Sequence, residues 1–406
     1  MQTDDVAHRI DYVAPKHVRD ALTSLGRIED VKFSLSNRRL AVAGFFKNRI
    51  AVFEVAIDLS QNAKNISLTD VAEFSSTSLN SPHGLDFIDD EKLLVTNREG
   101  QACIFELPVG ATGSYKLAPL AVIQSDHIST PGSVEVVKKE QGCCEALICN
   151  NYVNTVTKHR IDLSDGSSSK NGEIFIKKWL DVPDGICANR ERQWFAVSNH
   201  NAHAVFLYEN TPSLSEDSDP DGILRCNYYP HGLQFTSDGR FILVADAGSP
   251  YVNIYQRDES GWRGVRSPVV SVRVLSDETF LRGRVNPEEG GPKGIDINNA
   301  MNVFVTSCET QPLAFFDLGA ILEDVRFRTT GQRKAEETFA YGSNKPPETR
   351  LYDQKTFEVN YELGLQAKAQ DVQRVIWTLT NSRSWRLTAP LRWVTSKSGL
   401  TRNVSS

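Results

Sequence analysis

Several features that would define other protein classes are missing from this chain. It has no apolar run of the roughly 20 residues needed to span a bilayer. The first 20 residues, MQTDDVAHRIDYVAPKHVRD, are polar and of mixed charge, without the apolar segment of a secretory signal. Seven cysteines form no C-x-x-C pair, and an odd number without a signal argues against a disulfide framework. These absences predict a cytoplasmic protein with free thiols.

A strong charge of either sign is also missing. The formal net charge is −6 over 406 residues, which argues against a nucleic-acid partner held by bulk positive charge. Apolar residues make up 40% of the chain, enough for a sizeable core in one large or two ordinary domains. The adjacent Cys143 and Cys144 would point to opposite faces of a strand, so we interpret them as packing or surface residues rather than a redox pair.

The sequence does contain one phrase many times over. PHGLDFIDDEKLLVTN from Pro82 and PHGLQFTSDGRFILVAD from Pro230 share a turn, an alternating strand, a polar turn and a second strand. Four further stretches, beginning near positions 30, 131, 183 and 291, follow the same order, so the unit recurs every 47 to 62 residues. Alternation of this kind is typical of half-buried strands, and Asp238-Gly239 is typical of a tight hairpin turn.

A period near 50 residues with three or four strands per unit predicts an all-β fold, a six-bladed β-propeller with a short helical C-terminal extension. A solenoid shares this kind of repeat, and a seventh blade could be built from residues 325–362 and the N-terminus, so both alternatives stay open. We expect residues 1–26 to pair with the last blade and close the ring. Residues 27–347 would form the propeller, and residues 348–406 an extension that begins with an amphipathic helix.

Two positions of the repeat should meet at one end of the central channel. The first is the residue between Pro and Gly in the turn, at the start of the innermost strand. The six repeats place there Glu29, His83, Pro131, Asp184, His231 and Lys293, which we call the first ring. His83 and His231 would serve as general acid and base near neutral pH, unless they only line the channel as hydrogen-bonded residues. Lys293 would neutralise a carboxylate or an oxyanion.

The second position is the end of the second strand, which runs antiparallel to the first. It holds Gly44, Asn97, Asn150, Asn199, Asp246 and Ser307, which we call the second ring. Asn is depleted in strands, so its recurrence favours ligand binding, although Asn and Asp also end strands by bonding their own backbone. His200 and His203, which follow Asn199, read as outer or loop residues on the same face.

The side chains of the two rings suit a divalent cation. Carboxylate and amide oxygens are the ligands of Ca²⁺, whereas imidazole nitrogens suit Zn²⁺, Mn²⁺ or Fe²⁺ better. We expect a divalent metal here, Ca²⁺ before Zn²⁺ or Mn²⁺. EDSDPDG, from Glu216, also opens like a calcium loop, but its twelfth position is Tyr228 where a bidentate Glu is needed, so we interpret it as a solvated acidic loop.

At the ring residues the chain resembles the six-bladed gluconolactonase/regucalcin superfamily and its paraoxonase-like relatives, over about residues 27–330. The resemblance implies a metal-dependent lactone or ester hydrolase with one metal at the top of the channel, held by Glu29, Asp184 and Asn150. We expect the remaining ring residues that carry polar groups to bind substrate: Asn97, Asn199, Asp246 and Lys293. The chain departs from the family where His83 and His231 replace the turn Asn and where Asp30 replaces a glycine.

The C-terminal segment points to a second function. SRSWRLTAPLR, from Ser382, resembles the ending of bacterial glycosyltransferases of surface-polysaccharide assembly, and its Arg and Trp residues suit a membrane interface. Two hypotheses therefore stand. One is a hydrolase of a lactone or ester, sugar-derived in one version. The other is a non-catalytic propeller in a polysaccharide pathway, which binds a small molecule or glycan at the channel mouth and a membrane or protein partner through its tail.

Overall fold

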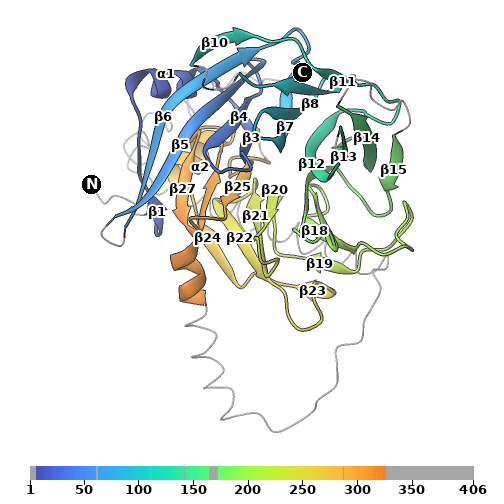
Figure 1. The fold of residues 1–406 in the computed structure, drawn as a ribbon. Helices are drawn as coiled ribbons and strands as arrows, with labels where there is room; N and C mark the ends of the chain where they lie inside the picture. The colour runs from blue at the N-terminus through green and yellow to red at the C-terminus, as the bar shows by residue number, and fades with distance from the viewer. Residues whose placement is uncertain are drawn as a thin grey trace, which may run out of the picture.

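The computed structural model describes residues 6–60, 63–108, 110, 112–140, 142–163, 172–286 and 288–325. In this part the chain forms six sheets, and the first strand of each sheet contacts the first strand of the next around a closed ring (Figure 1). The prediction of an all-β six-bladed propeller is confirmed, and a solenoid is excluded. Within these residues no helix is long and apolar enough to cross a membrane. The predicted helix and Trp-rich tail of residues 348–406 lie outside them.

Each blade is built around four antiparallel strands that follow in chain order, with one short strand passed over in blades two and five, and the last blade takes its fourth strand from the N-terminus. Blade one is β3 (Ile28–Phe33), β4 (Arg39–Gly44), β5 (Arg49–Ser60) and β6 (Ala63–Ser75), and blade two is β7 (Pro82–Asp89), β8 (Lys92–Asn97), β9 (Ala102–Glu106) and β11 (Ala121–Ile123). Blade three is β12 (Pro131–Glu140), β13 (Cys143–Asn150), β14 (Thr155–Asp162) and β15 (Glu173–Ile176), and blade four is β16 (Pro183–Ala188), β17 (Trp194–Asn199), β18 (Ala204–Glu209) and β19 (Gly222–Leu224). Blade five is β20 (Pro230–Phe235), β21 (Phe241–Asp246), β22 (Tyr251–Gln256) and β24 (Val270–Arg273), and blade six is β25 (Ile295–Asn298), β26 (Val303–Thr306), β27 (Ala314–Asp317) and β1 (Arg9–Ile10).

The remaining elements lie at the edges of the blades. β2 (Tyr12–Val13) and β10 (Gly113–Lys116) add to β6 in parallel, and β23 (Gly264–Arg266) adds to β19. Two helices, α1 (Lys16–Ser24) and α2 (Asp277–Gly283), connect blades, and residues 318–325 are also helical.

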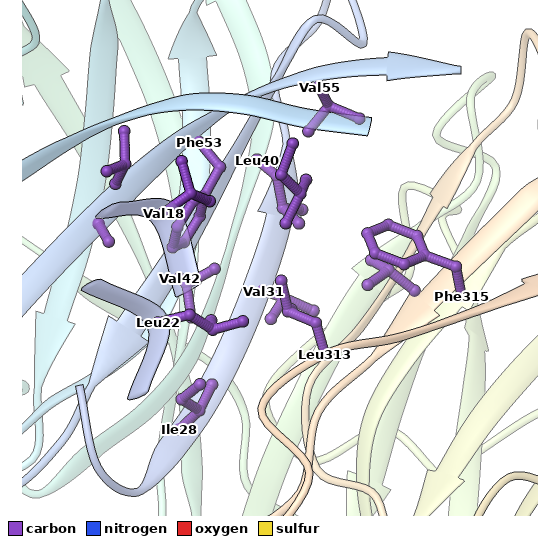
Figure 2. Packing of buried hydrophobic residues seen from close by; sticks show 14 of the residues in the cluster. Val18, Leu22, Ile28, Val31, Leu40, Val42, Phe53, Val55, Leu313 and Phe315 are labelled. Carbon is purple, nitrogen blue, oxygen red and sulfur yellow. The ribbon is translucent and has the colours of Figure 1, made fainter. Parts of the chain in front are cut away.

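The ring is closed by the N-terminus. β1 pairs antiparallel with β27, so that Arg9 lies opposite Phe316 and Ile10 opposite Phe315. The helix α1 follows and buries Val18, Ala21 and Leu22, the face that its apolar spacing predicts. Figure 2 shows Val18 and Leu22 beside Val42 and Phe53 of blade one, and the same cluster extends past Val31 to Leu313 and Phe315 of blade six. The first and last blades therefore share one core at the point of closure. Burial of each such side chain contributes about 1.5–3 kcal/mol to the stability of this closure.

The innermost strands carry a β-bulge at the Pro-x-Gly turn. In blade four the pairing with the second strand shifts between Pro183 and Ile186, and blades one, two, three and five shift at the same place. A bulge interrupts the ladder and leaves backbone groups without their usual partners. In blade four the Ser198 hydroxyl accepts the Gly185 N–H at 2.7 Å and donates to the carbonyl of His231 in the next blade at 2.7 Å. The bulge is thus tied to the neighbouring blade.

Carboxylates make a second set of bonds between blades, further along the innermost strands. Asp30 accepts the backbone N–H of Leu85 at 2.9 Å, and Asp296 accepts that of Phe33 at 2.7 Å. In the same way, Asp86 accepts the backbone N–H of Val136 and Glu135 accepts that of Ala188. Asp30, which breaks the glycine pattern of the turns, is therefore used to join blade one to blade two.

We predict that Gly185→Ala is strongly destabilising, because a Cβ at this position would lie 2.1 Å from the His231 carbonyl oxygen and 2.5 Å from Leu233 Cδ2. Backbone must move, and overpacking of this kind costs about 3 kcal/mol. Urea unfolding measures the loss against Gly319→Ala, where the nearest atom would lie at 3.3 Å. Equal stability of the two variants would contradict the close approach of blades four and five.

Candidate functional site

The bulges aim the first-ring side chains into one end of the channel. A bulge turns side chains of its strand away from the direction that regular alternation would give them. Bulges are common beside active sites for this reason. Five of the six first-ring residues meet there and are almost completely buried: Glu29, His83, Asp184, His231 and Lys293. The sixth position, in blade three, belongs to Gly132, which has no side chain, because Pro131 lies opposite Asn150 as Pro82 lies opposite Asn97; the expectation that Pro131 fills this position is wrong.

A strained residue precedes the proline in four of the turns. Ser81, Thr130, Val182 and Tyr229 have φ values of 55°, 47°, 51° and 57°. This left-handed conformation is unusual for any non-glycine residue and costs on the order of 1–3 kcal/mol, most of all for β-branched Val182. The carbonyl of Val182 accepts the His200 N–H at 3.0 Å, and the other three carbonyls accept equivalent bonds. These bonds hold the turn in place.

The second-ring residues complete the same clamp. Asn150 Oδ1 accepts the backbone N–H of Ser129 at 2.9 Å, two residues before the turn proline, while its Nδ2 donates to Thr157. Asn97, Asn199 and Asp246 accept the corresponding N–H groups of their blades at 2.9, 3.1 and 2.7 Å. The structure does not bring these four side chains to the buried cluster, because each is used to fix its own turn. The turn chemistry that was the alternative explanation accounts for them, so we leave Asn150 out of the metal ligands and the other three out of the substrate site.

A cavity opens at this end of the channel, and the residues that face it come one position after the second-ring residues in the chain. Phe45, Arg98, Asn151 and His200, each following a second-ring residue, line the cavity. Asn97 pairs with Pro82 rather than with His83 because of the bulge, so alternation turns the next side chain inward. His200 was noticed as an outer residue, whereas Arg98 and Asn151 were missed. The signal that could have found them is the alternation itself, shifted by one residue.

Glu29 lies at the centre of the cluster. Its Oε1 bonds to Arg27 and lies 3.4 Å from Lys293 Nζ. Its Oε2 is buried and receives no hydrogen bond among the described residues. The nitrogens nearest to Oε2 are Lys293 Nζ at 3.3 Å, His231 Nε2 at 3.5 Å and His83 Nε2 at 3.8 Å. Although burial opposes ionisation, the charges of Lys293 and the two histidines hold the pKa of Glu29 well below its usual range.

Asp184 is the second buried carboxylate. His231 Nε2 lies 2.9 Å from its Oδ2, and Asn151 Nδ2 donates to its Oδ1 at 2.8 Å. His83 Nε2 lies 3.8 Å from the same Oδ1, and Arg98 approaches it at 3.4 Å. Burial opposes its charge, but the two histidines outweigh it and hold the pKa of Asp184 well below the usual range.

The two histidines of the cluster carry different charges. Their rings stack with centroids 5.4 Å apart and planes at 20°. Burial, followed by the charge of Arg98, lowers the pKa of His83 to about 3. Burial acts on His231 in the same direction, but Asp184 and Glu29 outweigh it and raise its pKa to about 9. At neutral pH His83 is therefore neutral and His231 is an imidazolium.

A cationic group balances the carboxylates on the other side of Glu29. Lys293 Nζ lies 2.7 Å from Glu289 Oε2, and Arg27 reaches the same oxygen at 3.5 Å and Glu309 at 3.7 Å. Burial opposes the charge of Lys293, yet Glu29 and Glu289 raise its pKa. Lys293 thus neutralises a carboxylate, one of the two roles predicted for it, and is too deeply buried to line the cavity.

A cavity of about 670 Å³ opens above this cluster. Its wall is mostly polar and charged, with Phe45, Tyr152 and Val182 as apolar members. First-ring residues His83, Asp184 and His231 reach it directly. A cavity of this size accommodates a small organic molecule, and it brings such a molecule against buried groups with displaced pKa values, as active sites do.

One group of side chains in the described part of the chain could hold a metal ion. The ligand atoms of Glu29, His83 and His231 all lie within 4.8 Å of one another. This set shares Glu29 with the predicted ligands and adds two imidazoles in place of Asn150. The acidic loop from Glu216 does not form such a site, since Lys177 Nζ lies 2.8 Å from Glu216 Oε1 and the indole of Trp179 donates to Asp219.

Similarity to known proteins is seen in structure and not in sequence. No protein-family model matches the chain, and no curated protein matches its sequence. A functionally unknown protein from Desulfotomaculum acetoxidans is similar in structure, with 16% identity, a TM-score of 0.46 and coverage of 72% of this chain and 83% of the other. The β-propeller domain of Cps50 (Swd1) from Myceliophteria thermophila has 9% identity, a TM-score of 0.44 and coverage of 71% and 83%. A luciferin-regenerating enzyme has 9% identity, a TM-score of 0.46 and coverage of 72% and 92%.

We predict that the stability provided by His231 depends on pH. Its folded pKa of about 9 lies above the ordinary value of 6.5, so the contribution is complete below pH 6.5 and is lost as pH rises through 9. The displacement corresponds to roughly 3 kcal/mol. Urea unfolding of chelator-treated protein and of His231→Gln from pH 6 to 10 measures this. The gap between the two should narrow with rising pH, and a constant gap would contradict the assignment.

Proposed function

We propose that this chain is a metal-dependent hydrolase of lactones or esters, with its active site at the Glu29 cluster. The observation that carries the proposal is the buried Oε2 of Glu29, which lacks a hydrogen bond and faces two imidazole nitrogens at 3.5 and 3.8 Å. Its nearest cation, Lys293 Nζ, lies 3.3 Å away and is shared with Glu289, so an ion bound at this oxygen would satisfy it more fully.

The separations of these atoms suit a shared metal. They are too long for good hydrogen bonds, which need about 2.7–3.2 Å between heavy atoms. Two ligands bound at about 2.0–2.2 Å to one tetrahedral ion are about 3.4 Å apart. Two imidazoles and one or two carboxylates are a donor set for Zn²⁺, Mn²⁺ or Fe²⁺, whereas Ca²⁺ takes oxygen ligands almost alone. The proposed metal is therefore a transition metal rather than the Ca²⁺ that the ring composition first favoured.

The chain's own residues would divide the work in the following way. Glu29, His83 and His231 would hold the ion, which when bound would polarise a carbonyl and lower the pKa of a water. His231 must first lose its proton, which would pass through Asp184 Oδ2 at 2.9 Å to solvent in the cavity and leave Asp184 ionised again. Asp184 also reaches the cavity, where Asn151 fixes its orientation and leaves it able to accept a proton from the attacking water. Lys293 would keep Glu29 ionised from behind.

A different observation favours the second hypothesis, a binding module without catalysis. Around the cluster, Arg27, Arg98, His231 and Lys293 face the carboxylates of Glu29, Asp184, Glu289 and Glu309. These charges pair with one another without a metal. In this case the cavity would hold a small molecule or glycan. A metal titration followed by melting temperature decides between the two hypotheses.

We predict that chelator-stripped protein gains several degrees in melting temperature with Zn²⁺ or Mn²⁺ and less with Ca²⁺. A ligand at 100 times its Kd that binds only the folded state adds about 2.7 kcal/mol. Glu29→Gln should lose the gain, whereas Glu99→Gln, which alters a carboxylate of the cavity wall outside the ligand set, should keep it.

The metal-loaded protein would then be tested on a panel of lactones and aryl esters. Asp184→Asn should lower kcat by about 10²–10⁴ if this carboxylate takes the proton. No melting shift with any of the three metals would remove the hydrolase hypothesis and leave the binding module. A shift without turnover on the panel would retain the metal site and reject the proposed reaction.

A further inference from the structure

The guanidinium of Arg98 lies where the proposed metal would act. Its NH2 group is 2.5 Å from His83 Nε2 and 3.4 Å from Asp184 Oδ1. Both atoms belong to groups that would face a cation bound at the cluster. A hydrogen bond from Arg98 takes up the lone pair with which His83 would bind an ion, because a neutral imidazole offers only one acceptor nitrogen.

We propose that Arg98 is a displaceable stopper of the metal site, and that a divalent ion binds only by exchange with its guanidinium. This inference rests on the metal site proposed above. It concerns Arg98 in particular because the other cations of the cluster are fixed: Lys293 is 2% exposed and pairs with Glu289 at 2.7 Å, and Arg27 is held by three carboxylates.

The surroundings of Arg98 allow its side chain to leave while its backbone stays in place. The Arg98 N–H donates to the carbonyl of the strained Ser81 at 2.9 Å, and Asn97 fixes the preceding turn. The side chain itself lies in the cavity wall and is 16% exposed. Beyond His83 and Asp184, its guanidinium donates to the Thr130 carbonyl at 3.4 Å and lies 5.9 Å from the ring of Tyr152, a residue that is 71% exposed. A rotation of one side chain is sufficient to open the site.

The cavity can also receive the displaced group. Glu99 and Glu288 contribute exposed carboxylates to its wall, and neither has an ion pair with another described residue. A guanidinium that leaves His83 and Asp184 therefore stays among carboxylates and water, while the ion takes over the charge that it supplied to Asp184. The exchange conserves the electrostatic balance of the cluster. The positive charge beside Asp184 comes from Arg98 when no ion is bound and from the ion when Arg98 has moved away.

Isothermal titration of chelator-stripped protein with Zn²⁺ and Mn²⁺ tests this. Arg98→Met should bind about 10- to 100-fold more tightly than the wild type, because the ion no longer displaces a charge-assisted hydrogen bond. Arg98→Lys should fall between them. Arg240→Met removes the same charge from an exposed hairpin and should match the wild type. Tyr152→Ala, at an exposed position, should raise the affinity two- to threefold and tests the idea even if Arg98→Met does not fold.

The outcomes separate the stopper from the proposed function. Tight binding by Arg98→Met alone, with no binding by the wild type, means that Arg98 blocks the site without being displaced, which overturns the exchange and the metal-dependent function of the natural chain. Equal affinities of wild type, Arg98→Met and Tyr152→Ala overturn the stopper and leave the metal site standing. An absence of binding in every variant overturns both.

Discussion

The structure depends on how the six innermost strands satisfy their backbone groups where the bulges interrupt the ladder. Thr96 and Ser198 act in the same way: each hydroxyl accepts the N–H of its own turn glycine and donates to a carbonyl of the next blade. This bond brings neighbouring turns into backbone contact and leaves no room for a Cβ at Gly185 or Gly232, whose Cβ would lie 2.5 Å from the Lys293 carbonyl oxygen. Glycine is required here by proximity, since the φ of neither residue is positive.

The same bonds determine the electrostatics of the site. Because the turns are in contact, two carboxylates from blades one and four lie against two imidazoles from blades two and five. These groups are almost completely buried, so burial and neighbouring charges decide each protonation state, and the pKa values of the two stacked histidines lie at about 3 and about 9. The difference arises because Arg98 lies against His83, whereas Asp184 lies 2.9 Å from His231 Nε2 and 3.8 Å from His83 Nε2.

Repeats and alternation were enough to predict the propeller and the start of each innermost strand. The first ring could be predicted because four members follow a proline in a recurring phrase and Glu29 takes the same place in blade one. These five residues do lie together: Glu29, His83, Asp184, His231 and Lys293. The bulge could not be predicted, since an extra residue in a strand leaves no mark in composition. Because of the bulge, the residues that face the channel are Arg98 and Asn151 rather than the predicted Asn97 and Asn150. The roles of Arg27 and Glu289 depend on loops that lie outside the repeat.

The closure of the ring has a consequence for association between copies of the protein. In the described part of the chain the outer edge of β27 is covered by a short segment: Arg9 and Ile10 pair with it and the His8 carbonyl accepts the Asp317 N–H, after which β2 pairs with β6 before α1 begins. A strand this short contributes few hydrogen bonds, so it can detach while the rest of blade six remains folded. The exposed edge of β27 is then free to accept the same two residues from another copy. Exchange of N-terminal strands, in which each molecule completes its neighbour's last blade, would therefore join two copies without changing the other five blades.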